Sequence, residues 1–258
     1  MNTVFLSAGH GGNDPGAVGN GLKEKDINLQ TLLACKNELE RHGVKVITSR
    51  VKDENDPVQD ETKEANASGA SVAVSFHANA GGGDGFEAFY YTKSSKGKRL
   101  AELGEKHIKA IGQNSRGIKS GNHLYFVKNT NMTAVLFESF FVDNATDKTI
   151  GDTASEQKAF GVAYAKAILE YLDVEYKAVV SNSPGAKNDT FLVKVKIPNL
   201  NIRSGAGTNN KVLGKCPKGV YTIIETKDGK GSVAGWGKLK SSDAKNQKWV
   251  SLDYVEKL

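Results

Sequence analysis

Cysteine is scarce in this chain of 258 residues, which contains only Cys35 and Cys216. Two cysteines so far apart do not make a stabilising disulfide framework, and we expect each to be a small buried thiol. Long hydrophobic runs are also absent, because no stretch approaches the roughly 18 uninterrupted apolar residues of a membrane-spanning helix. The N-terminus lacks the basic and apolar segments of a signal peptide. We therefore expect neither membrane insertion nor an export signal.

The positive charge of the chain lies in its last third. The composition, with 38% hydrophobic and 25% charged residues, is that of an ordinary soluble protein, and the length favours two domains. Residues 1–172 hold 20 Lys+Arg and 21 Asp+Glu, whereas residues 173–258 hold 15 and 8, so the second part carries all of the net +6. This charge suits either a module attracted to a polyanion or a solvated surface. The lysines are not interleaved with aromatic residues, which argues against nucleic-acid binding.

The first two thirds of the chain alternate strand-like apolar runs with helical periodicity. A helix is expected from Asp26 to Arg41, with Gly43 as its stop signal, between the first two strands. We predict an α/β fold with a mostly parallel sheet flanked by helices. The expected strands cover residues 3–7, 45–48, 71–76, 86–91 and 133–138, and the further helices cover residues 59–67, 97–111 and 155–172.

A change of composition marks a second domain. The helical pattern ends at Leu172, and the small polar residues around 181–189 are typical of a linker. Beyond it, short apolar runs alternate with glycines, which predicts a small all-β barrel. We therefore divide the chain into an α/β domain at 1–172, a linker at 173–189 and a β domain at 190–258.

Two histidines and a glutamate are expected at one edge of the sheet. His10 follows the first strand in a glycine-rich segment, His77 ends another strand, and Glu24 lies in a loop just before a helix. Open α/β sheets place their sites at the carboxyl ends of the strands. Two imidazoles and one carboxylate with an open fourth position are typical of a catalytic zinc site.

Glu138 is the candidate catalytic carboxylate. It ends the apolar run 134–137, and burial there should raise its pKa, as suits a general base that takes a proton from water and hands it to a leaving amine. His123 is a weaker candidate for the cleft, and Asn79 fits a turn as well as a site. His42 is expected to cap a helix and His107 to lie on a charged helical surface. The glycines at 9, 11 and 12 fit neither a dinucleotide fingerprint nor a P-loop.

Four blocks in order carry a family resemblance over residues 1–172. They are the segments 8–17, Glu24, 75–79 and 138–144. They resemble the zinc amidase family that cleaves N-acetylmuramoyl-L-alanine bonds, found in autolysins, sporulation enzymes and phage endolysins. The resemblance implies Zn²⁺ held by His10, Glu24 and His77, with Glu138 as the catalytic residue. Phe140 departs from the family, where many members carry a small residue.

The second domain resembles a bacterial SH3-like cell-wall-binding module. The resemblance rests on Asn201-Ile202-Arg203-Ser204-Gly205 and on the segments 219–221, 235–239 and 249–251. It implies binding to a wall peptide or polymer. The aromatic residues Trp236, Trp249 and Tyr254 are candidates for stacking on a ligand, although in so small a barrel aromatic side chains more often form the core.

These expectations define one function and its alternatives. The chain is expected to be a peptidoglycan hydrolase that cleaves the amide between N-acetylmuramic acid and L-alanine, with peptidoglycan and anionic wall polymers as partners. A phage endolysin for Gram-positive walls, made in the host cytoplasm and released to the wall at lysis, is preferred because no signal peptide is evident. The alternatives are a bacterial autolysin or sporulation amidase, a zinc peptidase acting within stem peptides, and a non-catalytic wall-binding protein.

Overall fold

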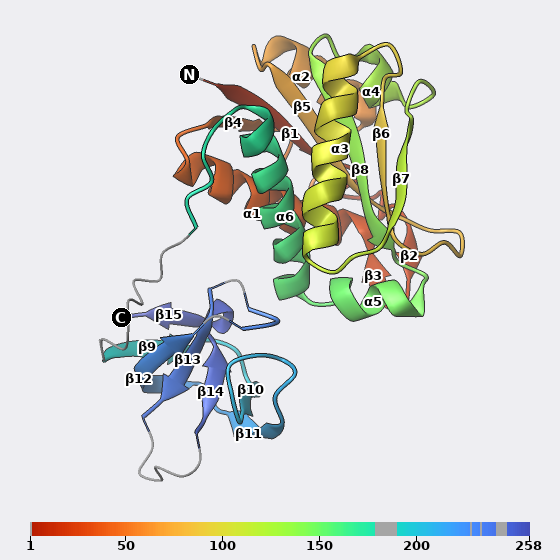
Figure 1. The fold of residues 1–258 in the computed structure, drawn as a ribbon. Coiled ribbons are helices and arrows are strands. Elements are labelled where there is room, and N and C mark those ends of the chain that lie inside the picture. The colour runs from red at the N-terminus through yellow and green to blue at the C-terminus, as the bar shows by residue number, and fades with distance from the viewer. Residues whose placement is uncertain (1, 179–189, 228, 233, 241–246) are drawn as a thin grey trace. The chain divides into compact units, whose positions relative to one another are not determined.

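The computed structural model describes residues 2–178, 190–227, 229–232, 234–240 and 247–258, and Figure 1 shows their fold. The chain forms two compact units, residues 1–177 and 178–258. Each unit is treated by itself below. Residues 179–189 of the predicted linker lie outside the described residues. None of the helices in the described residues has the length and apolar character that crossing a membrane requires.

A six-stranded sheet, counted over the described residues, forms the centre of the first unit. Its strands, in spatial order, are β4 (Lys45–Thr48), β1 (Thr3–Ala8), β5 (Val72–Asn79), β8 (Thr133–Phe141), β6 (Phe86–Tyr90) and β7 (Ser115–Ser120). The strands from β4 to β8 are parallel, β6 runs antiparallel to β8, and β7 is parallel to β6. The prediction of a mostly parallel sheet flanked by helices is confirmed.

Helices cover both faces of this sheet (Figure 1). On one face α1 (Glu24–Arg41), α3 (Ser95–Ala110) and α6 (Ala154–Tyr171) pack on the main core, to which β1 contributes Val4 and Leu6. On the other face α2 (Val58–Ala67) and α4 (Tyr125–Asn129) cover a smaller core that contains Phe5 and Ala73. Successive strand residues point to opposite faces, so β1 and β5 are apolar on both.

Local signals explain where several helices begin. The Ser94 side chain accepts a hydrogen bond from the Gly97 N–H at the start of α3. Thr153 and Glu156 form a capping box at the start of α6, which satisfies backbone donors that the helix itself leaves unpaired. α1 has no side-chain cap, and its first residue is the acidic Glu24. A carboxylate is favourable at this end because the helix dipole is positive there.

Some elements were not predicted from the sequence. These are β7, α4, the short pair β2 (Val18–Gly19) and β3 (Leu22–Lys23), and α5 (Ala145–Gly151). Phe140 is fully buried and packs on Phe160 of α6 at a ring-centroid distance of 5.6 Å. A Cβ at Gly151 would lie 2.5 Å from the Phe140 ring. Phe140 is therefore a core residue between α5 and α6.

The second unit is an antiparallel sheet of seven strands within the described residues. In spatial order these are β11 (Val212–Cys216), β10 (Leu200–Arg203), β14 (Trp249–Ser251), β13 (Trp236–Leu239), β12 (Gly219–Lys227), β9 (Phe191–Val195) and β15 (Val255–Lys257), with a short 3-10 turn, η1 (Leu252–Tyr254), before β15. Val193, Ile223 and Val250 belong to a core that this unit forms for itself. The all-β prediction is confirmed, and the SH3-like barrel stays a prediction.

The aromatic and arginine residues of the second unit have structural environments. Trp236 and Trp249 are 2% and 1% exposed, so neither offers a free face for stacking. Tyr254 packs partly buried against the core of the unit. Arg203 donates to the carbonyls of Thr208 and Asn210, each at 2.9 Å, and so fixes the loop after β10.

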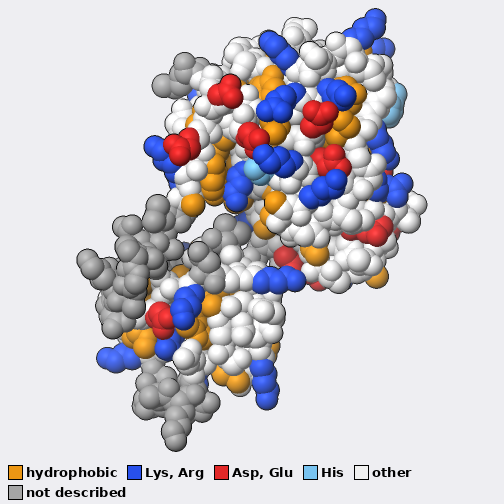
Figure 2. All heavy atoms as spheres, viewed as in Figure 1, with side chains coloured by type: hydrophobic (Ala, Val, Ile, Leu, Met, Phe, Trp, Pro, Cys, Tyr) orange, Lys and Arg blue, Asp and Glu red, His pale blue; other side chains and the backbone are white. Residues whose placement is uncertain are grey.

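The charged face of the first unit carries both signs. Figure 2 shows Lys and Arg side chains alternating with Asp and Glu over the helical face that contains α3. Lys106 of α3 pairs with Glu170 of α6 at 2.6 Å, and Lys109 pairs with Glu105 at 2.9 Å. Such a mixed surface keeps the unit soluble without building a field of one sign.

Candidate active site

The chain turns sharply after β1 and brings His10 over the sheet edge. His10 has φ +64°, a left-handed conformation that a non-glycine residue holds only where its surroundings enforce it. The Gly9 N–H donates to the Phe76 carbonyl at 3.1 Å, and the Gly9 carbonyl accepts from Asn28 Nδ2 at 3.0 Å. These hydrogen bonds tie the turn to β5 and to α1.

Arg50 supports the same turn from below. Arg50 is only 2% exposed. Its guanidinium donates to the carbonyls of Ala8 at 2.9 Å, Lys25 at 2.8 Å and Lys52 at 3.2 Å. A rigid fork of donors suits this task, because it joins three separate backbone segments. Arg50 thus fixes the end of β1 relative to the start of α1.

Glu24 enters the site from the first turn of α1. Its Oε2 accepts from the Ala17 N–H at 2.8 Å, and its Oε1 accepts from the Ala78 N–H at 3.1 Å. The residue is 4% exposed. Burial of a carboxylate is costly unless hydrogen bonds compensate it, and here both oxygens have donors.

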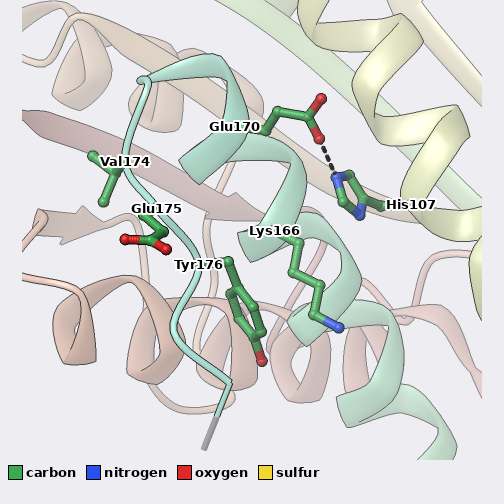
Figure 3. Close-up of a pocket in the computed structure, with 6 residues that line it drawn as sticks. All are labelled: His107, Lys166, Glu170, Val174, Glu175 and Tyr176. Atoms are coloured by element: carbon green, nitrogen blue, oxygen red, sulfur yellow. Dashed lines mark hydrogen bonds and ion pairs between the residues drawn. The ribbon is translucent and has the colours of Figure 1, made fainter.

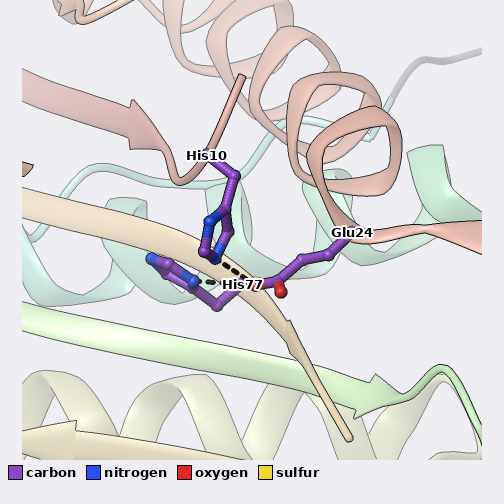
Figure 4. Close-up of side chains that lie close together, drawn as sticks. All are labelled: His10, Glu24 and His77. Carbon is purple, nitrogen blue, oxygen red and sulfur yellow. Dashed lines mark hydrogen bonds and ion pairs between the residues drawn. The ribbon is translucent and has the colours of Figure 1, made fainter. Parts of the chain in front are cut away.

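His10, Glu24 and His77 meet at one point, as Figure 4 shows. His77 Nδ1 lies 2.8 Å from Glu24 Oε1, and His10 Nε2 lies 3.2 Å from the same oxygen. One ligand atom from each residue lies within 4.8 Å of the others. The two imidazole rings face each other edge-on, with centroids 5.1 Å apart.

Asp14 orients the first histidine. Its Oδ2 lies 2.8 Å from His10 Nδ1, so that Nε2 is the ring nitrogen directed at Glu24. A carboxylate behind an imidazole is the usual arrangement around a metal-binding histidine, because it fixes the ring and its tautomer.

Two glycines leave room for the cluster. A Cβ on Gly9 would lie 2.2 Å from Cε1 and Nε2 of His77. A Cβ on Gly16, which has φ +64°, would lie 2.6 Å from Glu24 Oε2 and 2.7 Å from His10 Cδ2. Any side chain at either position would displace a member of the cluster.

The acid–base properties of the cluster follow from its mutual contacts. The hydrogen bond to Glu24 raises the pKa of His10 to about 9. Burial alone would lower the pKa of His77 and raise that of Glu24. The hydrogen bonds and neighbouring charges of the cluster together outweigh burial, so the pKa of His77 is raised and that of Glu24 is lowered. A carboxylate that stays ionised between two imidazoles is what a divalent cation requires.

The donor set fits a zinc ion. Two ligands held at 2.0–2.1 Å from a tetrahedral centre lie about 3.3 Å apart, close to the 2.8 and 3.2 Å that separate Glu24 Oε1 from the histidine nitrogens. Three protein ligands would leave one position open, as catalytic zinc sites do. The residues therefore fit the metal that the sequence predicts.

Glu138 lies beside the cluster and outside it. It pairs in register with His77 across the parallel β5–β8 ladder, so both side chains leave the same face of the sheet. Its Oε2 is buried and has no hydrogen-bond partner among the described residues. Burial raises the pKa of Glu138 to about 7, assisted by the charges of Glu24 and Glu87 and opposed by His77.

The remaining histidines lie away from the cluster. His123 is exposed and meets the Phe89 ring edge-on at 6.1 Å. His42 is the C-cap of α1, as predicted. His107 bonds Glu170 at 2.7 Å and lines a pocket of about 400 Å³, drawn in Figure 3, together with Lys166, Glu170, Val174, Glu175 and Tyr176. No member of the cluster lines this pocket.

Four residues around the site were not singled out from the sequence: Asp14, Arg50, Glu87 and Arg116. Asp14 had a signal, because an acidic residue four positions after a histidine can bond the ring. Glu87 lies on β6, which pairs antiparallel with β8, and faces Glu138 in register. Sites are expected at the carboxyl ends of parallel strands, so this expectation does not identify a residue such as Glu87 at the start of an antiparallel strand.

Comparisons with known proteins identify the family of the chain. Residues 4–170 match a family described as N-acetylmuramoyl-L-alanine amidase. The chain is similar to the sporulation-specific N-acetylmuramoyl-L-alanine amidase of Bacillus subtilis, with 31% identity over 232 residues, 88% of this chain and 86% of that protein. It is also similar to the endolysin of Bacillus phage SPP1, with 38% identity over 184 residues and 68% of each chain.

Further matches cover the first unit. The amidase CwlM of Bacillus licheniformis is 39% identical over 151 residues, or 57% of this chain, which spans 59% of that relative's length. The solved catalytic domain of the amidase CwlV from Bacillus (Paenibacillus) polymyxa is 33% identical, with a TM-score of 0.63 over 68% of this chain and 100% of that one. The chain belongs to the N-acetylmuramoyl-L-alanine amidase family of peptidoglycan-cleaving enzymes.

Proposed function

We propose that the first unit is a zinc-dependent amidase that cleaves the bond between the lactyl carbonyl of N-acetylmuramic acid and the L-alanine of the stem peptide. The observation that carries the proposal is the meeting of His10, Glu24 and His77 at one point, with Glu138 beside them on the next strand. His10 Nε2, Glu24 Oε1 and His77 Nδ1 would hold the ion. When bound, zinc supplies a Lewis acid that polarises a carbonyl and lowers the pKa of coordinated water to about 7.

Glu138 is the proposed proton carrier. Its buried Oε2, without a partner among the described residues, can accept a proton from the attacking water. The protonated carboxyl can then give that proton to the nitrogen of the leaving L-alanine. Burial favours the protonated form, since in the metal-free protein it raises the pKa of Glu138 to about 7. Asp14 and Arg50 do not carry protons in this scheme, since they hold His10 and its turn in place.

The proposed activity is tested by product analysis. Purified Gram-positive peptidoglycan is digested with and without a zinc chelator, and the products are weighed by mass spectrometry. We expect free L-alanine amino termini on intact stem peptides, which disappear when the chelator is present. Cuts within the stem peptide would identify a peptidase instead. No products from folded, zinc-loaded protein would leave a wall-binding role.

We propose further that residues 190–258 form an SH3-like module that binds the cell wall. The excess of basic residues in this part of the chain supports attraction to anionic wall polymers. Because Trp236 and Trp249 are buried, we expect this module to bind the wall through its basic side chains and not through aromatic stacking.

For origin, we propose a phage endolysin that is made in the host cytoplasm and reaches the wall at lysis. The similarity to the endolysin of phage SPP1 supports this, and the similarity to the sporulation amidase supports the bacterial alternative. Expression in a Bacillus host with and without a phage holin separates them. Lysis that needs the holin fits the endolysin, whereas lysis or wall turnover without it fits a bacterial amidase.

A further inference from the structure

A second charged cluster lies beside Glu138 and supplies neither a proposed metal ligand nor the proposed proton carrier. Glu87 faces Glu138 in register across the antiparallel β6–β8 pair. Arg116 Nε donates to Glu87 Oε1 at 2.6 Å, Lys119 Nζ bonds the same oxygen, and Asn79 Nδ2 lies 3.3 Å from Oε2. These four residues come from β5, β6 and β7.

The strand directions place this cluster at the catalytic edge. Because β6 and β7 run opposite to β8, their first residues lie where β5 and β8 end. Glu87 is the second residue of β6, and Arg116 is the second residue of β7. His77, Glu138 and Glu87 are therefore neighbours on the successive strands β5, β8 and β6, and Arg116 follows on the edge strand β7.

The cluster has more positive charge than its carboxylate needs. The Glu87 side chain is 6% exposed, whereas those of Arg116 and Lys119 are 45% and 37% exposed. Burial alone would raise the pKa of Glu87, but the hydrogen bonds from Lys119 and Arg116 outweigh it and hold the pKa below its ordinary value. One ionised carboxylate with two cations gives these three side chains a net charge of +1.

Arg116 keeps donors for a ligand. Only its Nε bonds Glu87, and no acceptor for the two terminal nitrogens is found in the part of the chain that the structure describes. The guanidinium lies over the Phe141 ring at 5.4 Å, which holds its plane. An ion pair with a structural role alone needs neither the second cation nor unpaired terminal nitrogens on Arg116. Two parallel N–H donors of a guanidinium are the geometry that binds a carboxylate.

We propose that Arg116, with Lys119 and Glu87, forms a subsite that binds a carboxylate of the stem peptide. The inference rests on the proposed amidase function. The saccharide side of the substrate is neutral, because its lactyl carboxyl is consumed in the scissile amide. The stem peptide carries carboxylates, on the second residue and at its C-terminus. The subsite thus assigns the peptide to the β6–β7 side of Glu138.

Matched substrates test this assignment. Muramyl pentapeptides are compared with a free or amidated α-carboxyl on the second residue, and with a free or amidated C-terminus. For the wild-type enzyme we expect kcat/KM to fall by about tenfold or more when one of the two carboxylates is amidated, with most of the effect in KM. The pair that shows the loss identifies which carboxylate is bound.

Variants assign the effect to the guanidinium. In Arg116→Gln we expect the ratio of kcat/KM for the preferred acid to kcat/KM for its amide to fall to about one. Arg116→Lys keeps a charge beside Glu87 and lacks the paired donors, so it should lose the preference too. Arg99→Gln, an exposed arginine on α3, is the control and should behave like the wild type.

The possible failures are distinguishable. Wild-type enzyme that cleaves acids and amides equally well would overturn the subsite while leaving the amidase intact. A loss in Arg116→Gln that is equal for both substrates would show a structural role only, and an Arg116→Lys enzyme that still prefers the acid would exclude the guanidinium fork. If no substrate is cleaved, the proposed function fails, and titration of the free stem peptides into wild type and Arg116→Gln still tests the subsite by binding.

Discussion

Two carboxylates at one sheet edge have opposite surroundings. Glu24 accepts hydrogen bonds from two backbone N–H groups and two imidazoles, which keep it ionised. Glu138 has a buried oxygen with no partner among the described residues, and burial raises its pKa to about 7. Environments that separate two titratable groups in this way assign them different roles. Glu24 suits a metal ligand, and Glu138 suits a proton carrier.

Replacing Glu138 should stop turnover and leave the metal in place. General acid–base catalysis contributes about 10²- to 10⁴-fold, so Glu138→Gln should lose at least about a hundredfold in kcat. Zinc content, measured on the dialysed protein, should stay near one ion per chain. His77→Ala removes a proposed ligand and should lose both the activity and the ion. A Glu138→Gln enzyme that still lyses walls at the wild-type rate would refute its assignment.

The same substitution should change stability with pH in the zinc-free protein. The unfolded carboxyl ionises above its ordinary pKa of 4.5, while the folded one holds its proton to about 7. Wild-type stability therefore falls as pH rises from about 4.5 to about 7, and Glu138→Gln avoids this loss. Above pH 7 the variant should be more stable by about 1–3 kcal/mol, with the gain absent below pH 4.5. Denaturant unfolding at pH 4 and 8 measures this, and equal gains at both would contradict it.

At the scale of the elements, the site depends on how closely the β1 turn approaches β5. The Gly9 N–H bonds the Phe76 carbonyl at 3.1 Å, which leaves no space between Gly9 and the His77 ring. Any Cβ at this position would overlap the His77 ring. The glycine is thus needed for the geometry of the cluster as much as for the turn.

Gly9→Ala should displace His77 and weaken metal binding. We expect at least a tenfold loss of zinc affinity, comparable to the loss of a supporting partner around a metal ligand. Competition with a chromophoric chelator measures the affinity. Gly214→Ala in the second unit is the matched control, since nothing lies within 4 Å of the added atom. Equal zinc affinity in the two variants would show that the β1 turn can shift to accept the methyl group without weakening metal binding.

The antiparallel β6 decides which residues surround Glu138. If β6 ran parallel to β8, its last residues would lie beside Glu138 in place of Glu87. Its actual direction brings Glu87, and with it Arg116 of β7, next to Glu138. Strand direction is set by the connections and the packing of the whole sheet, so the local pattern of residues 86–91 does not reveal it.

At the scale of the whole molecule, each unit has its own hydrophobic core. The first unit contains the complete cluster and Glu138, and the second contains all of the net positive charge. Residues 1–177 alone should therefore keep activity on a small muramyl peptide within about twofold of the full chain, because His10, Glu24, His77 and Glu138 all belong to the first unit. Initial rates of cleavage of that substrate by the fragment and by the full chain measure this activity. A fragment that folds but does not cleave would contradict the prediction that the first unit is sufficient for cleavage.

The second unit should bind walls through charge. Exposed charges are screened over about 8 Å at physiological ionic strength, so wall binding of the full chain should weaken steeply as salt rises, and residues 1–177 should bind less at low salt. Sedimentation with purified walls at several salt concentrations measures both. Binding that is indifferent to salt would point to a specific pocket.

The sequence determined the parts that local chemistry encodes. The spacing of apolar residues in strand-like and helical runs predicted the fold class and most of the sheet. This worked because those apolar residues are the ones that form the main core. The sequence also named His10, Glu24, His77 and Glu138, since strand ends and glycine-rich turns mark such positions in the chain itself. Short elements such as α4 and β7 escaped, because packing stabilises them more than propensity does.

Only the tertiary structure decided what stands next to what. It brought one Glu24 oxygen to both histidines and aimed His10 with Asp14. It also turned β6 against β8, so that a carboxylate with two cations lies beside Glu138. The physical reason is that propensities and motifs act over a few residues, whereas the distances and pKa values of a site arise from segments that meet only after the sheet has formed and its interior has been desolvated.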